Sequence, residues 1–196
     1  MPKLRFSGQT GLTRRAALGG AFVLLATPGL AQASASAVSY MRKVAKDMLS
    51  AHRQGTAASF KRAILRHADV AGIADYSLGQ YRAKLPAGQK QAYYAGTATF
   101  MARYFADQSR EYVVAKYEIG EASADGKDVN VQTKVFLMNG QSYTVVWRLT
   151  PRGGGFKVAD AKVMGISLIY LQRGIFTSFL SKRNGDVGQL VAALNR

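Results

Sequence analysis

Three side chains in this 196-residue sequence are candidates for acid–base chemistry: His52, His67 and Asp160. A general acid or base must exchange a proton near the working pH, and histidine does so without any perturbation of its pKa. Both histidines fall in basic surroundings on expected helices, outside the paired-histidine or His-x-Glu spacing typical of metal sites. Asp160 lies inside an expected strand, where a structural hydrogen-bonding role is the alternative to catalysis. We therefore predict no catalytic residue, no metal and no cofactor.

The composition excludes several other kinds of site. Without cysteine, the chain has no disulfide, thiol nucleophile, iron–sulfur cluster or cysteine-bound zinc. Gly153-Gly154-Gly155 lies between expected strands rather than before a helix, so it predicts a turn and not a phosphate-binding loop. Lys and Arg outnumber Asp and Glu by 27 to 11, which gives a net charge of +16. Such a polycation favours anionic partners, either nucleic acid or the phosphate groups of a membrane.

Residues 1–33 are typical of an export signal. A basic, polar stretch precedes an uncharged apolar run over residues 16–30, and the small residues Ala31-Gln32-Ala33 stand at the expected cleavage positions. Arg14-Arg15 resembles a twin-arginine signal, with a general secretory signal as the alternative. Both routes lead to the periplasm, where a cationic protein seldom meets nucleic acid. Residues 34–196 then form one domain of net charge about +12, since the leader holds four cations and no acid.

The remaining sequence predicts helices before and after an antiparallel sheet along the chain. Apolar residues recur at three- and four-residue spacing in its first and last parts, and alternate with polar residues between positions 112 and 163. Asn139-Gly140 is a strong hairpin signal, and Pro86 suits the first turn of a helix. Helices are expected over residues 41–54, 57–64, 73–85, 86–109, 166–182 and 187–194, and strands over 112–119, 129–137, 143–149 and 156–163. This order predicts the α+β class, with a curved antiparallel sheet of about four strands.

A long helix packed across a curved sheet leaves a space between them, and the sequence pattern does not decide what fills it. The expected inward-facing side chains form either a packed core or the wall of an apolar pocket, since both need the same periodicity. A pocket in such a fold can bind a ligand or serve a small enzyme of the isomerase or dehydratase kind. The inward-facing set is Val129, Val131, Val135, Val145, Trp147, Phe100, Tyr104, Phe176 and Phe179.

Two short runs near the carboxyl end carry a family resemblance. Gly165-Ile166-Ser167-Leu168-Ile169 is followed by Arg173 and Phe176, and Phe156-Lys157-Val158-Ala159-Asp160 comes before it. The segment from Asp69 to Leu194 thereby resembles the MlaC family, also called the toluene-tolerance family, which has Gly-Val-Ser-Leu-Val and Trp-Lys-Val-x-Asp at these places. Two positions depart from the family pattern: Phe156 replaces the tryptophan, and Gln172 replaces the tyrosine before Arg173.

This resemblance implies a periplasmic carrier of phospholipid, or of hopanoid in one branch of the family. It implies a deep apolar cavity between the sheet and the helices. It also implies docking to an inner-membrane ABC lipid-transport complex and to an outer-membrane lipoprotein complex, which together maintain lipid asymmetry. Arg173 becomes the candidate for contact with the lipid headgroup. The candidate cavity residues are Phe100, Tyr104, Val135, Val145, Trp147, Val163, Leu168, Ile169, Phe176 and Phe179.

Overall fold

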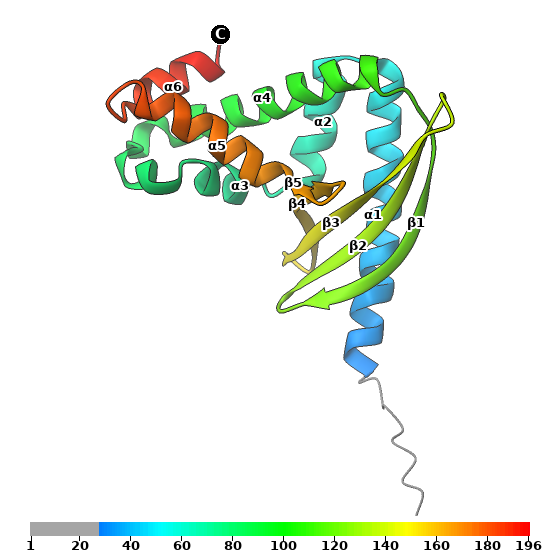
Figure 1. Ribbon diagram of the computed structural model, residues 1–196. Coiled ribbons are helices and arrows are strands. Elements are labelled where there is room, and N and C mark those ends of the chain that lie inside the picture. Colours follow the sequence, from blue (N-terminus) through cyan, green and yellow to red (C-terminus); the bar gives the residue numbers. More distant parts are fainter. Residues whose placement is uncertain (1–27) are drawn as a thin grey trace, which may run out of the picture.

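The computed structural model describes residues 28–196, so residues 1–27 of the expected export signal lie outside the described part. Figure 1 shows a sheet packed against the long helix α1, with a layer of further helices extending to one side. Within residues 28–196 no helix is long and apolar enough to cross a membrane. The α-helices are α1 (Pro28–Gln54), α2 (Ala57–His67), α3 (Val70–Ser77), α4 (Lys90–Glu111), α5 (Leu168–Ser181) and α6 (Val187–Leu194), with 3₁₀ helices η1 (Gly79–Lys84) and η2 (Ala87–Gln89).

One antiparallel sheet has the strand order β1-β2-β3-β4-β5, which confirms the expected meander. Its strands are β1 (Val114–Asp125), β2 (Asp128–Leu137), β3 (Ser142–Arg152), β4 (Gly155–Val163) and β5 (Ile166–Ser167). The register pairs Val145 with both Thr133 and Val163, and paired residues share a face of the sheet. Val146 therefore lies on the opposite face, with its partners Gln132 and Lys162.

Buried side chains form three clusters. The first joins α1 to the sheet and includes Met41, Val44, Val131 and Leu149. The second joins α3, α4, α5 and α6 around Tyr93, Phe176 and Leu180, and the third joins α1, α2 and α4 around Phe60 and Ala102. Val135, Val145 and Val163 lie further along the inner face of the sheet and belong to none of these clusters. That part of the face is free to border a space.

The expected helix boundaries are confirmed at three positions. Gly55, with a φ of +63°, ends α1 in the left-handed conformation that glycine adopts without strain. The side chain of Thr56 accepts a hydrogen bond from Ser59 N at 3.2 Å and caps α2. Asp186 caps α6 in the same way, with Gln189 N 3.2 Å from its Oδ1. These caps fix where the helices enter and leave the interior.

The structure differs from the predicted elements at three places around the interior. The pattern over residues 73–85 predicts one helix, whereas α3 ends at Ser77 and a 3₁₀ helix follows, because Gly79 has a φ of +53°. The helix predicted from residue 166 begins at Leu168, because Ile166 and Ser167 pair with β4 as a fifth strand. Pro86 precedes a short 3₁₀ turn, and α4 begins only at Lys90.

Gly96 allows α4 to approach the end of α6 closely. A Cβ atom at this position would lie 2.8 Å from both Leu194 Cβ and Asn195 Nδ2. Overpacking of this kind costs about 1–3 kcal/mol, and the better helix propensity of alanine returns about 1 kcal/mol. We expect Gly96→Ala to lower the free energy of unfolding by about 1 kcal/mol, measured by urea denaturation. At Gly88 a Cβ would meet no atom within 4 Å, so Gly88→Ala is the control, and equal results for both variants would contradict the close approach.

Candidate functional site

A cavity of about 740 Å³ lies between the inner face of the sheet and helices α1, α4 and α5. This volume falls within the range of about 300–1,000 Å³ that is usual for small-molecule sites. The space that the sequence pattern left undecided is therefore open in this structure. The sheet wall includes Tyr117, Thr133, Val135, Val145, Trp147 and Val163, and the helical wall includes Ala45, Met48, Tyr104, Phe105, Leu168 and Leu171.

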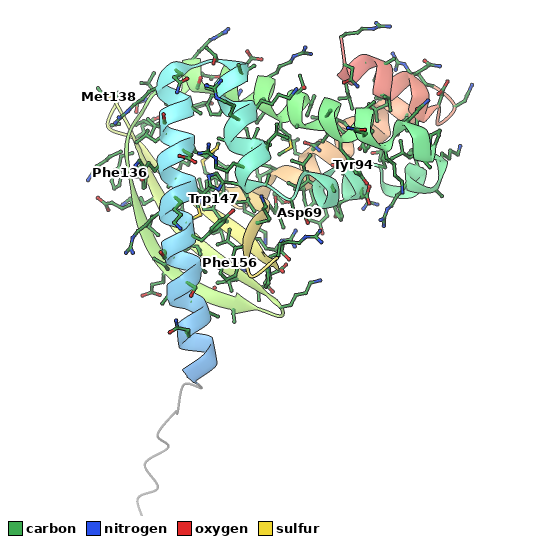
Figure 2. All side chains as sticks on the ribbon, turned by 180° about the vertical axis from the view of Figure 1, so that it is seen from behind. Asp69, Tyr94, Phe136, Met138, Trp147 and Phe156 are labelled. Carbon is green, nitrogen blue, oxygen red and sulfur yellow. The ribbon has the colours of Figure 1, made fainter. Side chains whose placement is uncertain are left out.

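A second cavity of about 90 Å³ adjoins the larger one, among residues of α1, α2, α4, α5 and β4. Phe100 and Ile169 line it, together with Ile64 and Ile73. Trp147 lines both cavities. It is labelled in Figure 2 and lies on β3 beside α1. Seven residues line both cavities and form the partition between them: Met48, Tyr104, Phe105, Trp147, Ala161, Leu168 and Leu171.

The lining of the larger cavity contains no Asp, Glu, Lys or Arg among the residues that the structure describes. Two polar groups in its wall are satisfied within the protein. Trp147 Nε1 donates to Thr133 Oγ1 at 2.9 Å, and Ser109 Oγ donates to the carbonyl of Ala106 at 2.7 Å. Satisfied polar groups need no water, so the wall can present apolar surface to the space. Such a wall suits hydrocarbon better than a charged group, because a charge buried without a partner is costly.

Polar lining side chains gather where α4 ends and β3 begins. Gln108 lies in the last turn of α4 and Tyr112 directly follows it, while Gln141 precedes β3 and Ser142 and Tyr143 begin that strand. Burial, with a smaller contribution from Tyr112, raises the pKa of the Tyr143 phenol, so this hydroxyl is neutral. This end of the cavity therefore offers uncharged hydrogen-bonding groups. An amphipathic ligand would place its polar part here and its hydrocarbon deeper inside.

The cavity opens beside the turn between β4 and β5. Met164, Ile166 and Leu171 all line it, yet they are 72%, 61% and 43% exposed. Side chains that border both the cavity and solvent mark an opening. Gly165, with a φ of +84°, forms the turn that carries Met164 and Ile166 to this position. A ligand can enter between this turn and the end of α4, where Tyr112 is also exposed.

A sequence model of the MlaC protein family matches residues 32–196. The chain belongs to the MlaC family. A search among curated proteins finds no match. Among solved structures, a phospholipid-binding protein from Ralstonia solanacearum, solved in complex with a phospholipid, is similar to this chain with a TM-score of 0.66 and 24% sequence identity. The similarity covers 83% of this chain and 96% of that one, and at this identity it shows a shared fold.

The run that carries the MlaC resemblance builds the start of α5 at the cavity wall. Asp160 is 4% exposed, and its carboxylate accepts hydrogen bonds from Ser167 Oγ at 2.6 Å, Ala161 N at 2.7 Å and Ile169 N at 3.2 Å. Ser167 in turn caps α5, since its Oγ accepts from Tyr170 N at 3.4 Å. Asp160 thus ties β4 to the first turn of α5. Its carboxylate holds the backbone, as the structural alternative for this residue predicts.

The two histidines of this MlaC family member also hold the fold together. His67 Nε2 lies 2.8 Å from Asp47 Oδ2, and Tyr40 Oη lies 3.3 Å from His67 Nδ1, so both ring nitrogens link α2 to α1. The hydrogen bond to His67 is the main cause that lowers the pKa of Asp47. His52 Nε2 accepts a hydrogen bond from Val114 N at 2.9 Å and joins the end of α1 to the start of β1.

Protonation of His52 should weaken the fold as the pH falls. Burial lowers the pKa of His52 below its usual 6.5, so the folded chain favours the neutral ring that accepts from Val114 N. Below pH 6.5 the unfolded chain binds more protons than the folded chain at this residue, so the free energy of unfolding decreases. Urea denaturation on both sides of pH 6.5 measures this slope. His52→Gln should flatten it, and an equal slope in both proteins would contradict this role.

The structure places eight of the ten predicted cavity residues on a cavity wall. Phe176 and Phe179 line neither cavity. Phe176 is 1% exposed and packs against Phe100 and Tyr93, with ring centroids 5.1 and 6.4 Å apart. Phe176 lies on the same helical face as Ile169 and Gln172, which line the smaller cavity, but it is further along α5, where that face packs against α4 and α6. Tyr104, Val135, Val145, Trp147, Val163 and Leu168 line the larger cavity, whereas Phe100 and Ile169 line only the smaller one.

Arg173, the predicted headgroup contact, lies on α5 and lines neither cavity. Its guanidinium carbon stands 4.9 Å from the centroid of the Tyr76 ring, an arrangement typical of a cation–π contact. The same side chain lies against Gly79, where a Cβ atom would come within 3.0 Å of its Nε. No ion pair joins it to a carboxylate within residues 28–196. Arg173 therefore contacts η1 and α3 rather than the interior.

Several lining residues are absent from the predicted set. Phe105 lies beside the apolar stripe of α4 and Leu171 lies within that of α5, so the helical period contained a signal for both. Tyr117 alternates with Lys116 and Glu118, so the strand period contained a signal for it too, although register shifts on either side interrupt the alternation of β1. The further lining residues outside the predicted set include Ala45, Met48, Leu49, His52, Leu137, Met164 and Ile166.

Proposed function

We propose that this MlaC family protein is a periplasmic carrier that holds one membrane lipid, with the acyl chains in the larger cavity. One observation carries the proposal: an open space of about 740 Å³ whose lining contains no Asp, Glu, Lys or Arg among the described residues. Membership of the MlaC family supports it. The phospholipid bound by the similar protein from Ralstonia solanacearum supports phospholipid as the cargo, with hopanoid as the alternative.

Hydrocarbon burial explains why such a carrier is needed. Each methylene removed from water contributes about 0.8 kcal/mol, so two chains of about sixteen carbons amount to roughly 25 kcal/mol. A free lipid therefore does not cross an aqueous compartment at a useful rate. A bilayer stabilises the chains nearly as well as an apolar cavity does, so transfer between the two is close to balanced. We propose that an inner-membrane ABC complex and an outer-membrane lipoprotein complex set the direction of transfer.

The polar headgroup would stay at the opening. Among the residues that the structure describes, no Lys or Arg lines the larger cavity to neutralise a phosphate, so a charged headgroup inside it would lack a partner. Gln141, Ser142 and Tyr112 offer neutral hydrogen-bonding groups at the solvent-facing end. In this arrangement the acyl chains contribute more to binding than the headgroup does. We also propose residues 1–33 as the export signal that brings the carrier to the periplasm.

The alternative is a small enzyme of the isomerase or dehydratase kind that uses the same pocket. His52 lines the larger cavity, and His67 and Asp160 line the smaller one. The carrier fits the geometry better, because all three side chains are engaged in hydrogen bonds within the protein. Asp160 accepts from two backbone N–H groups and the Ser167 hydroxyl, and His67 is held between Asp47 and Tyr40. These hydrogen bonds favour structural roles for both side chains.

Lipid uptake from vesicles tests the proposal. The protein is mixed with vesicles containing a phospholipid that bears a fluorescent acyl chain, separated from them, and assayed for bound label. We expect about one lipid per chain, displaced by excess unlabelled phospholipid but not by glycerol 3-phosphate, because the cavity recognises hydrocarbon. No uptake, or equal displacement by glycerol 3-phosphate, would contradict an acyl-chain site.

A further inference from the structure

Five exposed apolar side chains lie together beside the cavity opening. Met164 and Ile166 on the β4–β5 turn, and Tyr170, Leu171 and Ile175 on α5, are between 43% and 72% exposed. Leu171 borders the same opening as Met164 and Ile166, and Ile175 lies one helical turn further along α5. Single exposed apolar residues are ordinary, whereas a group of this size marks an interaction surface. We call these five residues the apolar rim.

The chain segment that carries the apolar rim has no acidic residue. Between residues 161 and 182 the charged side chains are Lys162, Arg173 and Lys182, without any Asp or Glu. Arg173 stands 4.9 Å from the centroid of the Tyr76 ring, and the Tyr76 and Tyr170 rings lie 5.4 Å apart. The guanidinium is therefore held close to the rim, and no carboxylate of residues 28–196 pairs with it.

We infer that the apolar rim is the surface with which this protein docks on an anionic lipid bilayer. A bilayer offers hydrocarbon to the aliphatic side chains, an interface that tyrosine prefers, and phosphate to Arg173. The position of the rim favours a bilayer over an acidic protein, because an acyl chain could then pass from the membrane into the cavity without crossing water. The inference rests on the proposed carrier function, since the opening matters only if a lipid uses it.

Vesicle co-sedimentation tests this docking surface. Vesicles of phosphatidylglycerol mixed with phosphatidylcholine are compared with vesicles of phosphatidylcholine alone. The test variant is Met164→Ser/Ile166→Ser/Tyr170→Ser, and Leu65→Ser is the control, because Leu65 is 54% exposed on α2 outside the rim. We expect the wild type and Leu65→Ser to bind the anionic vesicles equally. The triple variant should bind at least about tenfold more weakly, and Met164→Ser alone about threefold more weakly.

Two results would overturn the docking surface. One is a wild-type protein that does not sediment with anionic vesicles. That result would indicate that the apolar rim binds a protein partner instead of a bilayer. The other is equal sedimentation of the rim variants and Leu65→Ser, which would show adsorption by net charge alone. Lipids extracted from the same preparations separate this inference from the proposed function. Bound lipid without vesicle binding contradicts only the docking surface, whereas vesicle binding without bound lipid supports the surface and contradicts the carrier.

Discussion

Val145→Trp should lower lipid uptake from vesicles by at least about tenfold, because it places an indole ring where we propose that the acyl chains lie. Val145 lies on β3, is 5% exposed and lines the larger cavity between its register partners Thr133 and Val163. A ring that enters an open space meets little resistance. We therefore expect the free energy of unfolding to change by less than about 1.5 kcal/mol, whereas insertion into a filled core costs up to about 3 kcal/mol.

Val146→Trp is the matched control for this prediction. Val146 is the next residue of the same strand, and its partners Gln132 and Lys162 place it on the opposite face of the sheet. The same indole ring on that face should leave lipid uptake at the wild-type level. A Val145→Trp protein that loses about 3 kcal/mol of stability and still takes up lipid normally would show that the space is a packed core.

Asp160→Ala should destabilise the fold by about 3–4 kcal/mol, measured as the free energy of unfolding in urea. The Asp160 carboxylate accepts from Ala161 N, Ile169 N and Ser167 Oγ within a buried site. The variant leaves two buried N–H groups without acceptors, and each unsatisfied group costs about 1–3 kcal/mol. The start of α5, which forms part of the cavity wall, should loosen as a consequence.

Asp107→Ala is the control for Asp160→Ala. Asp107 is 70% exposed and 3.8 Å from Arg110, so its removal should change stability by less than about 0.5 kcal/mol. Asp160→Asn should fall between the two variants, because an amide oxygen still accepts from a backbone N–H. If Asp160→Ala abolished lipid uptake at unchanged stability, Asp160 would contact the cargo instead of holding β4 to α5.

The sheet could be predicted from the sequence because strand alternation and turn residues are local signals. Val129 to Leu137 alternate with polar residues, and Asn139-Gly140 closes the hairpin, with a φ of +85° at Gly140. The helix boundaries at Thr56 and Asp186 are confirmed for the same reason, since each cap is a bond between residues three positions apart. The end of α3 was missed because the apolar spacing continues past Gly79, whereas its positive φ and its close contact with Arg173 on α5 appear only in the folded chain.

The cavity itself could not be predicted from periodicity, because a residue that faces a void has the same spacing as one that faces a core. Val145 and Phe176 show this. Both are almost fully buried and both lie on expected apolar faces, yet Val145 borders the larger cavity while Phe176 packs among helices. Only the packing of α5 against α3, α4 and α6 separates the two cases. The same long-range packing moves Arg173 away from the interior and onto Tyr76.

Native mass spectrometry of the protein purified without detergent decides whether the larger cavity holds a lipid in its natural setting. We predict one bound species whose extra mass equals that of a single membrane lipid, and whose extract yields acyl chains. Because burial of two acyl chains contributes roughly 25 kcal/mol, this lipid should stay bound through purification. A clean mass of the chain alone, from a protein that also takes up no lipid from vesicles, would contradict the carrier.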